Sequence, residues 1–170
     1  MNNIFLIGFM GTGKSTIARC LRRKCRIRVV EMDERIAREA GMSIPEIFEK
    51  YGEEYFRKLE TELLSDIQGK KNRIVSCGGG VVLRQQNVEM MKKSGKVVLL
   101  TANPQTILKR VENNKNRPLL EGRKTIEDIQ NLMEARRARY EEAADIVVCV
   151  ENKNSEDICI EIMKKLGLGD

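Results

Sequence analysis

The 170-residue chain contains no histidine and no tryptophan, and aromatic residues make up only 4% of it. The absence of histidine excludes imidazole acid–base catalysis and histidine-ligated metal sites. So few aromatic rings leave little material for the stacking surfaces with which proteins hold single-stranded nucleic acid. These two absences argue against histidine-dependent catalytic or metal sites and against a single-stranded nucleic-acid site.

Long apolar runs and paired cysteines are also missing. No segment approaches the roughly 20 apolar residues that a membrane helix needs, and the apolar start has no basic leader of the kind that opens a signal peptide. The cysteines are odd in number and show no paired short spacing, which argues against a zinc site or a disulfide framework. They are Cys20, Cys25, Cys77, Cys149 and Cys159. We expect reduced thiols in a cytoplasmic protein that does not contact membranes.

The length predicts one compact domain over residues 1–170. Hydrophobic residues make up 41% and charged residues 33%, and 31 basic against 25 acidic residues give a net charge of +6. This excess fits either affinity for nucleic acid or a small enzyme with anionic substrates. We favour the second interpretation, with a monomer and no nucleic-acid partner, because the arginines lie beside motifs typical of phosphate sites.

Short apolar runs alternate with longer helical patterns. The predicted strands are Ile4–Ile7, Ile27–Glu31, Ile74–Ser76, Val97–Thr101 and Ile146–Val150. The predicted helices are Lys14–Lys24, Asp33–Ala40, Glu53–Gln68, Gln85–Lys93, Pro104–Glu112, Ile126–Glu142 and Ser155–Leu166. This order predicts an α/β fold, a three-layer doubly wound domain around a five-stranded parallel sheet. The polar stretch 113–124 is predicted to be a lid loop.

The first predicted strand runs directly into Gly8-Phe9-Met10-Gly11-Thr12-Gly13-Lys14-Ser15, which satisfies the phosphate-loop pattern G-x-x-x-x-G-K-[ST] in full. Glycines let backbone N–H groups converge on phosphate oxygens, and the N-terminus of the following helix adds positive charge. Lys14 can bridge the terminal phosphates and the Ser15 hydroxyl can ligate Mg²⁺. The alternative is a chance glycine-rich turn, but the strand before it and the helix after it favour a nucleotide site.

Nucleotide binding does not by itself define a reaction. Motors and GTPases usually add an apolar strand that ends in an aspartate, whereas the strands here end in Thr101 and in Ser76-Cys77. An Asn-Lys-x-Asp element for reading guanine is also missing. We therefore predict a P-loop kinase fold that phosphorylates a metabolite or a nucleoside monophosphate.

Further elements indicate where an acceptor would bind. Glu31 and Asp33 fall at the carboxyl end of the second predicted strand, where open α/β sheets hold ligands; strand alternation would point both the same way, although Asp33 could instead be a helix N-cap. The segment Ile47–Glu62 is expected to be helical, with Arg57 either matched to a ligand carboxylate or engaged in a surface ion pair. Three glycines in a row permit a ligand to approach the backbone closely.

Two arginines complete this pattern. Arg117 lies in the predicted lid, where a mobile arginine stabilises charge on a transferring phosphate. Arg136 opens the run Arg136-Arg137-Ala138-Arg139, which on its own is typical of a solvated helix face.

The motifs together resemble shikimate kinase, in order and over nearly the whole chain. They are Gly8–Thr16, Glu31-x-Asp33, Gly41-Met42-Ser43-Ile44 leading to Phe48, Phe56-Arg57-x-x-Glu60, Gly78-Gly79-Gly80, Arg117-Pro118-Leu119 and Arg136-x-x-x-Tyr140. The resemblance implies transfer of the ATP γ-phosphate to the 3-hydroxyl of shikimate, with Mg²⁺ as cofactor. It also implies an acceptor-binding helical segment over about 33–62.

The resemblance assigns roles to individual residues. It implies catalytic roles for Lys14, Asp33 and Arg117. Contacts to ATP are implied for Gly11, Thr12, Gly13, Lys14, Ser15, Thr16, Arg110, Arg117 and Lys153. Contacts to shikimate are implied for Asp33, Phe48, Phe56, Arg57, Glu60, Gly78, Gly79, Gly80 and Arg136. Ser15 would ligate Mg²⁺ directly, and Glu31 and Ser76 would assist through water.

One position departs from the family pattern, because Glu31 stands where the family usually has aspartate. The extra methylene moves this carboxylate outward and changes its reach toward Mg²⁺. The sequence also leaves open another metabolite kinase, of the gluconate or nucleoside monophosphate type, and a non-catalytic nucleotide-dependent module.

Overall fold

The computed structural model describes residues 2–112 and 125–169. The chain forms a five-stranded sheet in the order β2-β3-β1-β4-β5, and every pairing is parallel. The strands are β1 (Asn3–Ile7), β2 (Arg28–Glu31), β3 (Arg73–Ser76), β4 (Gly95–Thr101) and β5 (Ile146–Cys149). Each predicted strand is confirmed to within two residues at either end.

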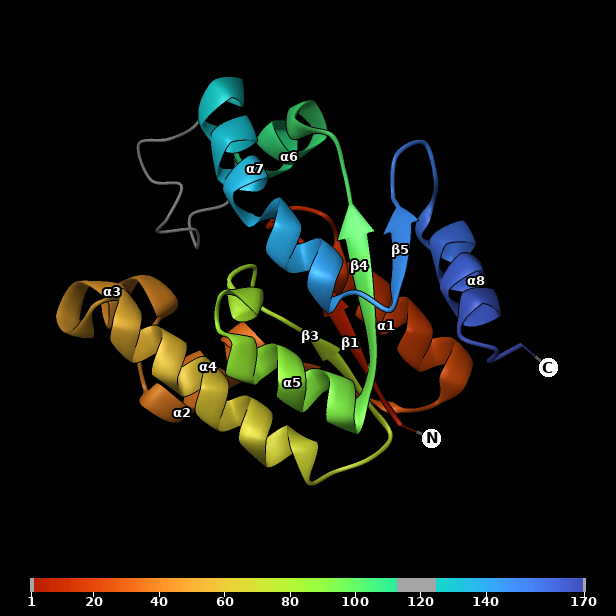
Figure 1. The fold of residues 1–170 in the computed structure, drawn as a ribbon, viewed down its shortest axis with the longest axis horizontal. Helices are drawn as coiled ribbons and strands as arrows, with labels where there is room; N and C mark the ends of the chain where they lie inside the picture. The colour runs from red at the N-terminus through yellow and green to blue at the C-terminus, as the bar shows by residue number, and fades with distance from the viewer. Residues whose placement is uncertain (1, 113–124, 170) are drawn as a thin grey trace.

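Helices cover both faces of this sheet, with α5 and α7 in front of it and α1 behind it (Figure 1). They are α1 (Lys14–Cys25), α2 (Met32–Ala40), α3 (Ile44–Tyr51), α4 (Glu53–Gln68), α5 (Gln85–Ser94), α6 (Pro104–Val111), α7 (Ile126–Ala143) and α8 (Ser155–Lys165), with a short 3₁₀ turn, η1 (Val81–Leu83). The predicted three-layer α/β architecture is confirmed.

The central strand explains why the sequence pattern identified the fold so directly. All residues of β1 are buried, because β3 and β4 flank it and helices pack on both of its faces. Such a strand is almost entirely apolar, as Ile4–Ile7 are; the buried Asn3 at its start is the exception, and its side chain hydrogen-bonds the backbone of Lys70 and Arg73. At the carboxyl end of β1 the chain leaves the sheet at Gly8, where the phosphate loop begins.

The expected continuous helical segment Ile47–Glu62 is wrong, because the chain breaks at Gly52 between α3 and α4. Gly52 has a φ of 86°, a left-handed value that glycine adopts without strain. The start of α3 has a recognisable signal in the sequence, the pattern Ser43-x-x-Glu46. Ser43 is the N-cap: its hydroxyl accepts the Glu46 N–H at 3.3 Å and donates to the Glu46 carboxylate at 3.0 Å.

A second correction concerns the acidic pair. Strand β2 ends at Glu31 and α2 begins at Met32, so strand alternation does not extend to Asp33. The N-cap position is occupied by Glu31 rather than by Asp33, and the Glu31 side chain forms no capping bond. Both carboxylates still reach one cavity, for reasons that only the turn from strand into helix provides.

Candidate active site

The loop between β1 and α1 has the conformation that its glycines permit. Gly11 and Gly13 have φ values of 82° and 94°, and Gly13 is the N-cap of α1. The Lys14 ammonium donates to the carbonyls of Gly8 at 2.7 Å and Phe9 at 3.0 Å. The loop thus curves around the Lys14 side chain, with the N-terminus of α1 directed at the same place.

A cavity of about 330 Å³ lies beside this loop on the α6 and α8 side. Its lining includes all the described residues predicted to contact ATP, namely Gly11, Thr12, Gly13, Lys14, Ser15, Thr16, Arg110 and Lys153. Arg110 on α6 donates to the Gly11 carbonyl at 2.8 Å, and Lys153 pairs with Glu161 at 2.9 Å. Two cations therefore line the cavity beside the phosphate loop, which favours an anionic ligand.

A second cavity, of about 270 Å³, lies on the other side of Lys14 and Ser15, which line both. Its walls come from the phosphate loop, α2, α3, α4, the loop after β3, and α7. Every described residue predicted to contact the acceptor lines it: Asp33, Phe48, Phe56, Arg57, Glu60, Gly78, Gly79, Gly80 and Arg136. The remaining predicted site residue, Arg117, and the predicted lid over 113–124 lie outside the described residues.

The hydroxyl of Ser15 lies at the boundary between the two cavities. It donates to Glu31 Oε2 at 2.8 Å and lies 3.4 Å from the Ser76 hydroxyl. The other carboxylate oxygen of Glu31 is buried and has no hydrogen-bond partner among the described residues. The longer side chain at position 31 thus reaches Ser15, and this trio of oxygen atoms offers hard ligands of the kind Mg²⁺ accepts.

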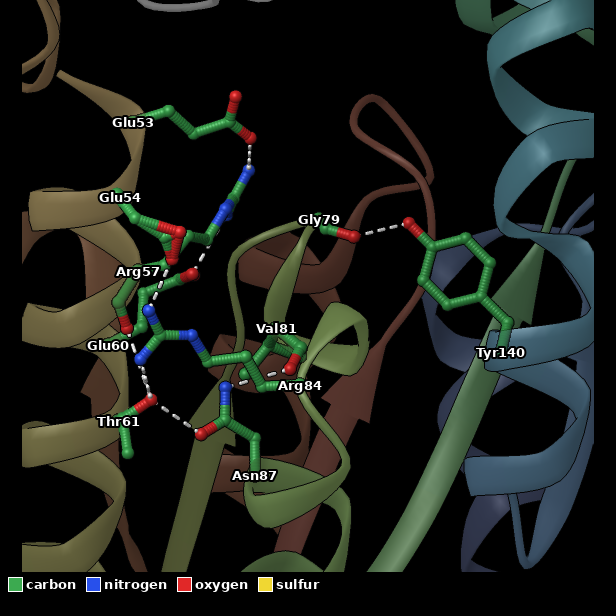
Figure 2. Close-up of polar contacts among 10 residues, drawn as sticks. All are labelled: Glu53, Glu54, Arg57, Glu60, Thr61, Gly79, Val81, Arg84, Asn87 and Tyr140. Carbon is green, nitrogen blue, oxygen red and sulfur yellow. Dashed lines mark hydrogen bonds and ion pairs between the residues drawn. The ribbon is translucent and has the colours of Figure 1, made fainter.

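The acceptor cavity holds a buried ion pair between Arg57 and Glu60, at 2.8 Å (Figure 2). Arg57 is 6% exposed and also pairs with Glu53 at 3.1 Å. An ion pair is therefore present, as the alternative interpretation of Arg57 held, but it is buried in the cavity wall rather than on the surface. Phe56 packs on Phe48 with ring centroids 5.0 Å apart, which closes the wall between α3 and α4.

The charge state of Glu60 is set by its burial. Its side chain is fully buried, which raises the pKa to about 7, although Arg57 opposes the shift. One of its oxygens, Oε2, has no partner in the described chain, and the same holds for Asp33 Oδ1. Two unsatisfied carboxylate oxygens in one cavity indicate a ligand that donates hydrogen bonds, such as an alcohol.

Unpaired cationic atoms line the same cavity. Nε of Arg57 and Nη1 of Arg136 are buried without acceptors among the described residues. Arg136 lies on α7, is 5% exposed, and has its guanidinium 5.9 Å from the Phe9 ring centroid. It is therefore no part of a solvated face, unlike its exposed neighbours Arg137 and Arg139. The two guanidiniums indicate an anionic group on the same ligand.

The glycines of the triplet lie against these side chains, and two of them leave no room for a Cβ. A Cβ on Gly78 would lie 2.6 Å from Glu60 Oε2 and 3.0 Å from Asp33 Oδ1. A Cβ on Gly80 would lie 2.5 Å from the guanidinium carbon of Arg57, and one on Gly79 would lie 3.4 Å from Arg136 Nη1. Gly78 and Gly80 are therefore required for close approach rather than for backbone conformation, since neither has a positive φ, whereas a Cβ on Gly79 would only reach ordinary contact.

The sequence assigned no acceptor contact to some residues that line the acceptor cavity, among them Met10, Arg19, Glu34, Ile44 and Cys77. Met10 and Ile44 belong to motifs that were recognised, and Cys77 precedes the glycine triplet. Arg19 and Glu34 carried no signal, because their place at the cavity is set by the packing of α1 and α2.

Two cavities that meet at the lysine and serine of a phosphate loop, on a parallel sheet of this order, define a P-loop kinase of a small molecule. Among the described residues, no helix is long and apolar enough to cross a membrane.

Comparisons with known proteins identify the particular family. The family model described as shikimate kinase matches residues 10–167. The chain is 41% identical to the shikimate kinase of Dehalococcoides mccartyi over 97% of this chain and 93% of the relative. It is 42% identical to that of Geobacter sulfurreducens over 94% and 88%, respectively. A solved shikimate kinase from Acinetobacter baumannii, in complex with shikimate, superposes with a TM-score of 0.93 at 32% identity and covers 98% of this chain and 93% of its own. The chain belongs to the shikimate kinase family.

Proposed function

We propose that this chain transfers the γ-phosphate of ATP to the 3-hydroxyl of shikimate, with ATP in the cavity beside α6 and α8 and shikimate in the cavity beside α2, α3 and α4. The observation that carries the proposal is the set of unsatisfied atoms in the second cavity. One atom of each of four side chains has no partner there in the described chain: Asp33 Oδ1, Glu60 Oε2, Arg57 Nε and Arg136 Nη1. A ligand that carries hydroxyl groups as well as one carboxylate offers donors to the two carboxylate oxygens and acceptors to the two guanidinium nitrogens.

The polarity of the cavity favours this acceptor over a nucleoside monophosphate. A doubly charged phosphate would be repelled by the carboxylates of Asp33 and Glu31, which line the cavity with Glu60. The solved family member that superposes over nearly the whole chain contains shikimate.

In the proposed mechanism, Asp33 Oδ1, which has no partner in the described chain, accepts a hydrogen bond from the reacting hydroxyl and orients it toward Lys14. Asp33 takes the hydroxyl proton as the oxygen bonds to the γ-phosphorus, and ADP leaves. Arg57 and Arg136 bind the carboxylate of shikimate, and Phe48 and Phe56 exclude water from the wall behind it. Lys14 moves from the carbonyls of Gly8 and Phe9 to the phosphates and stabilises the charge on the transferred group. Because phosphoryl transfer depends mainly on positioning and electrostatics, the orientation of the hydroxyl matters more than the basicity of Asp33.

The proposal includes Mg²⁺, whose chemistry is to neutralise the phosphate oxygens. Ser15 would hold it directly, and Glu31 and Ser76 would do so through water. The residues fit this role because Glu31 Oε1 is buried without a partner in the described chain while Oε2 binds Ser15. We extend the proposal to Arg117, which would contact ATP from a lid over 113–124, and to helices α2, α3 and the first half of α4 as the acceptor-binding part.

The test is a coupled ADP-release assay with purified protein, ATP and Mg²⁺ across shikimate, quinate, gluconate and nucleoside monophosphates. We expect turnover with shikimate and little with the others. Turnover with a monophosphate or gluconate but not with shikimate would refute the assignment of the acceptor.

A further inference from the structure

The Gly78–Gly80 loop, which we propose contacts the acceptor, is tethered on two sides by side chains that do not line the acceptor cavity. On the α7 side, the hydroxyl of Tyr140 donates to the Gly79 carbonyl (Figure 2). On the α5 side, the amide nitrogen of Asn87 donates to the Val81 carbonyl at 2.9 Å. Tyr140 and Asn87 are absent from the residues that line the cavity, although the Tyr140 hydroxyl also contacts the Arg136 side chain, which does line it.

The Asn87 side chain is held in one orientation. It is only 1% exposed, and its oxygen accepts the Thr61 hydroxyl of α4 at 2.8 Å. Because the Val81 carbonyl can only accept, the amide nitrogen must face Val81 and the oxygen must face Thr61. The bond thus connects α4, which carries Arg57 and Glu60, to the residue that follows Gly80.

These tethers leave no carbonyl of the segment 78–81 free. The Gly78 carbonyl accepts the Val81 N–H at 3.1 Å and the Gly80 carbonyl accepts the Leu83 N–H at 3.1 Å. Tyr140 and Asn87 bind the other two carbonyls, so every peptide plane that begins in this segment has a fixed direction.

The direction of one plane matters most for the acceptor. In a trans peptide the carbonyl and the N–H of the next residue point to opposite sides. Figure 2 shows the Gly79 carbonyl directed at Tyr140, away from Arg57 and Glu53. The Gly80 N–H is therefore turned toward the side of α4, and it has no acceptor among the described residues.

We propose that Tyr140 and Asn87 are positioning residues for the acceptor, which hold the Gly78–Gly80 backbone so that the Gly80 N–H faces the ligand beside Arg57. Glycine is the residue whose backbone is most free to rotate, so three in a row would not keep one orientation unaided. The two tethers supply that order before the ligand arrives, and this preorganisation strengthens binding. This inference depends on the proposed function, because it assigns the loop to acceptor binding.

The test compares Tyr140→Phe, which removes only the hydroxyl, with the matched control Tyr51→Phe at an exposed tyrosine on α3. A second pair is Asn87→Asp, which replaces the donor to Val81, and Gln86→Glu, the same chemical change at the exposed neighbouring position. Each variant is measured for KM of shikimate, KM of ATP, and the dissociation constant of shikimate by calorimetry without nucleotide.

We expect Tyr140→Phe and Asn87→Asp to raise the KM and the dissociation constant of shikimate by about tenfold, the usual effect of one lost hydrogen bond. The KM of ATP should stay at the wild-type value in both variants. In the two control variants, all three constants should stay at the wild-type values. A purely structural role would lower the melting temperature without separating the two substrates, and that result, or an unchanged KM for shikimate in Tyr140→Phe, would overturn the inference. Absence of shikimate turnover by the unmodified protein would instead refute the proposed function.

Discussion

The sharpest prediction concerns Gly80→Ala, because Gly80 lies directly against the Arg57 guanidinium in the acceptor cavity. The new Cβ would lie 2.5 Å from the guanidinium carbon of Arg57, whereas two carbon atoms at contact prefer about 3.5–4.0 Å. One of the two groups must therefore move by about 1 Å. Arg57 cannot withdraw freely, because Glu60 holds it at 2.8 Å and Glu53 at 3.1 Å.

The magnitude follows from what Arg57 would lose. A displaced guanidinium gives up a charge-assisted hydrogen bond to the acceptor carboxylate, worth about 1.5–3 kcal/mol. This corresponds to an increase of about 10- to 150-fold in the KM of shikimate. Weakening the buried Arg57–Glu60 pair should also lower the free energy of unfolding, by less than the roughly 3–5 kcal/mol that follows when one partner is removed.

The assay is steady-state kinetics with each substrate varied, together with urea unfolding. Gly69→Ala is the matched control, because a Cβ there would have no closer neighbour than the Asp66 carbonyl at 3.8 Å and φ is −76°. It should leave both KM values unchanged and stabilise the fold slightly or not at all. If Gly80→Ala binds shikimate as tightly as the unmodified protein, the close approach of Gly80 and Arg57 has no role in the acceptor site.

Further predictions concern charge and metal. Lys14→Met should lower kcat by about 10²- to 10³-fold and leave the calorimetric dissociation constant of shikimate unchanged; weaker shikimate binding would contradict the assignment of Lys14 to the phosphates. Glu31→Ala should raise the Mg²⁺ concentration for half-maximal activity by about tenfold or more, and an unchanged requirement in a magnesium titration would remove Glu31 from the metal site. Arg110→Ala should raise the KM of ATP alone, and an equal rise in the KM of shikimate would contradict its placement in the nucleotide cavity. Burial raises the pKa of Glu60 from 4.5 to about 7. Between these two pH values the folded state therefore binds more protons than the unfolded state. The contribution of Glu60 to stability decreases as pH rises through this window. Glu60→Gln removes this dependence, so its unfolding free energy relative to the unmodified protein should increase from pH 5 to pH 7, by at most about 1.4 kcal/mol per pH unit; a flat difference would contradict a raised pKa.

The sequence determined those features that depend on neighbours along the chain. A fully buried parallel strand is almost entirely apolar, so β1 was visible as Ile4–Ile7, and the phosphate loop followed from the glycine spacing before Lys14. The serine cap at Ser43 was equally local and would have located the start of α3, and Gly52 was available as the residue at which the helix ends. The acceptor-binding residues were predicted from the order of the motifs, which resembles that of a known family.

Tertiary structure alone decided what those residues do to one another. Arg57 could be interpreted from the sequence as a surface pair or as a ligand contact, and only the packing of α4 against the glycine loop shows it buried and paired. Likewise, Arg136 resembled its exposed neighbours until α7 placed it over Phe9. Burial, a raised pKa and an unsatisfied atom arise from contacts between segments that are distant in the chain, such as Glu60 with Gly78 or Tyr140 with Gly79. Local sequence patterns do not encode such contacts. Only the folded structure therefore shows which side chains the three glycines lie against.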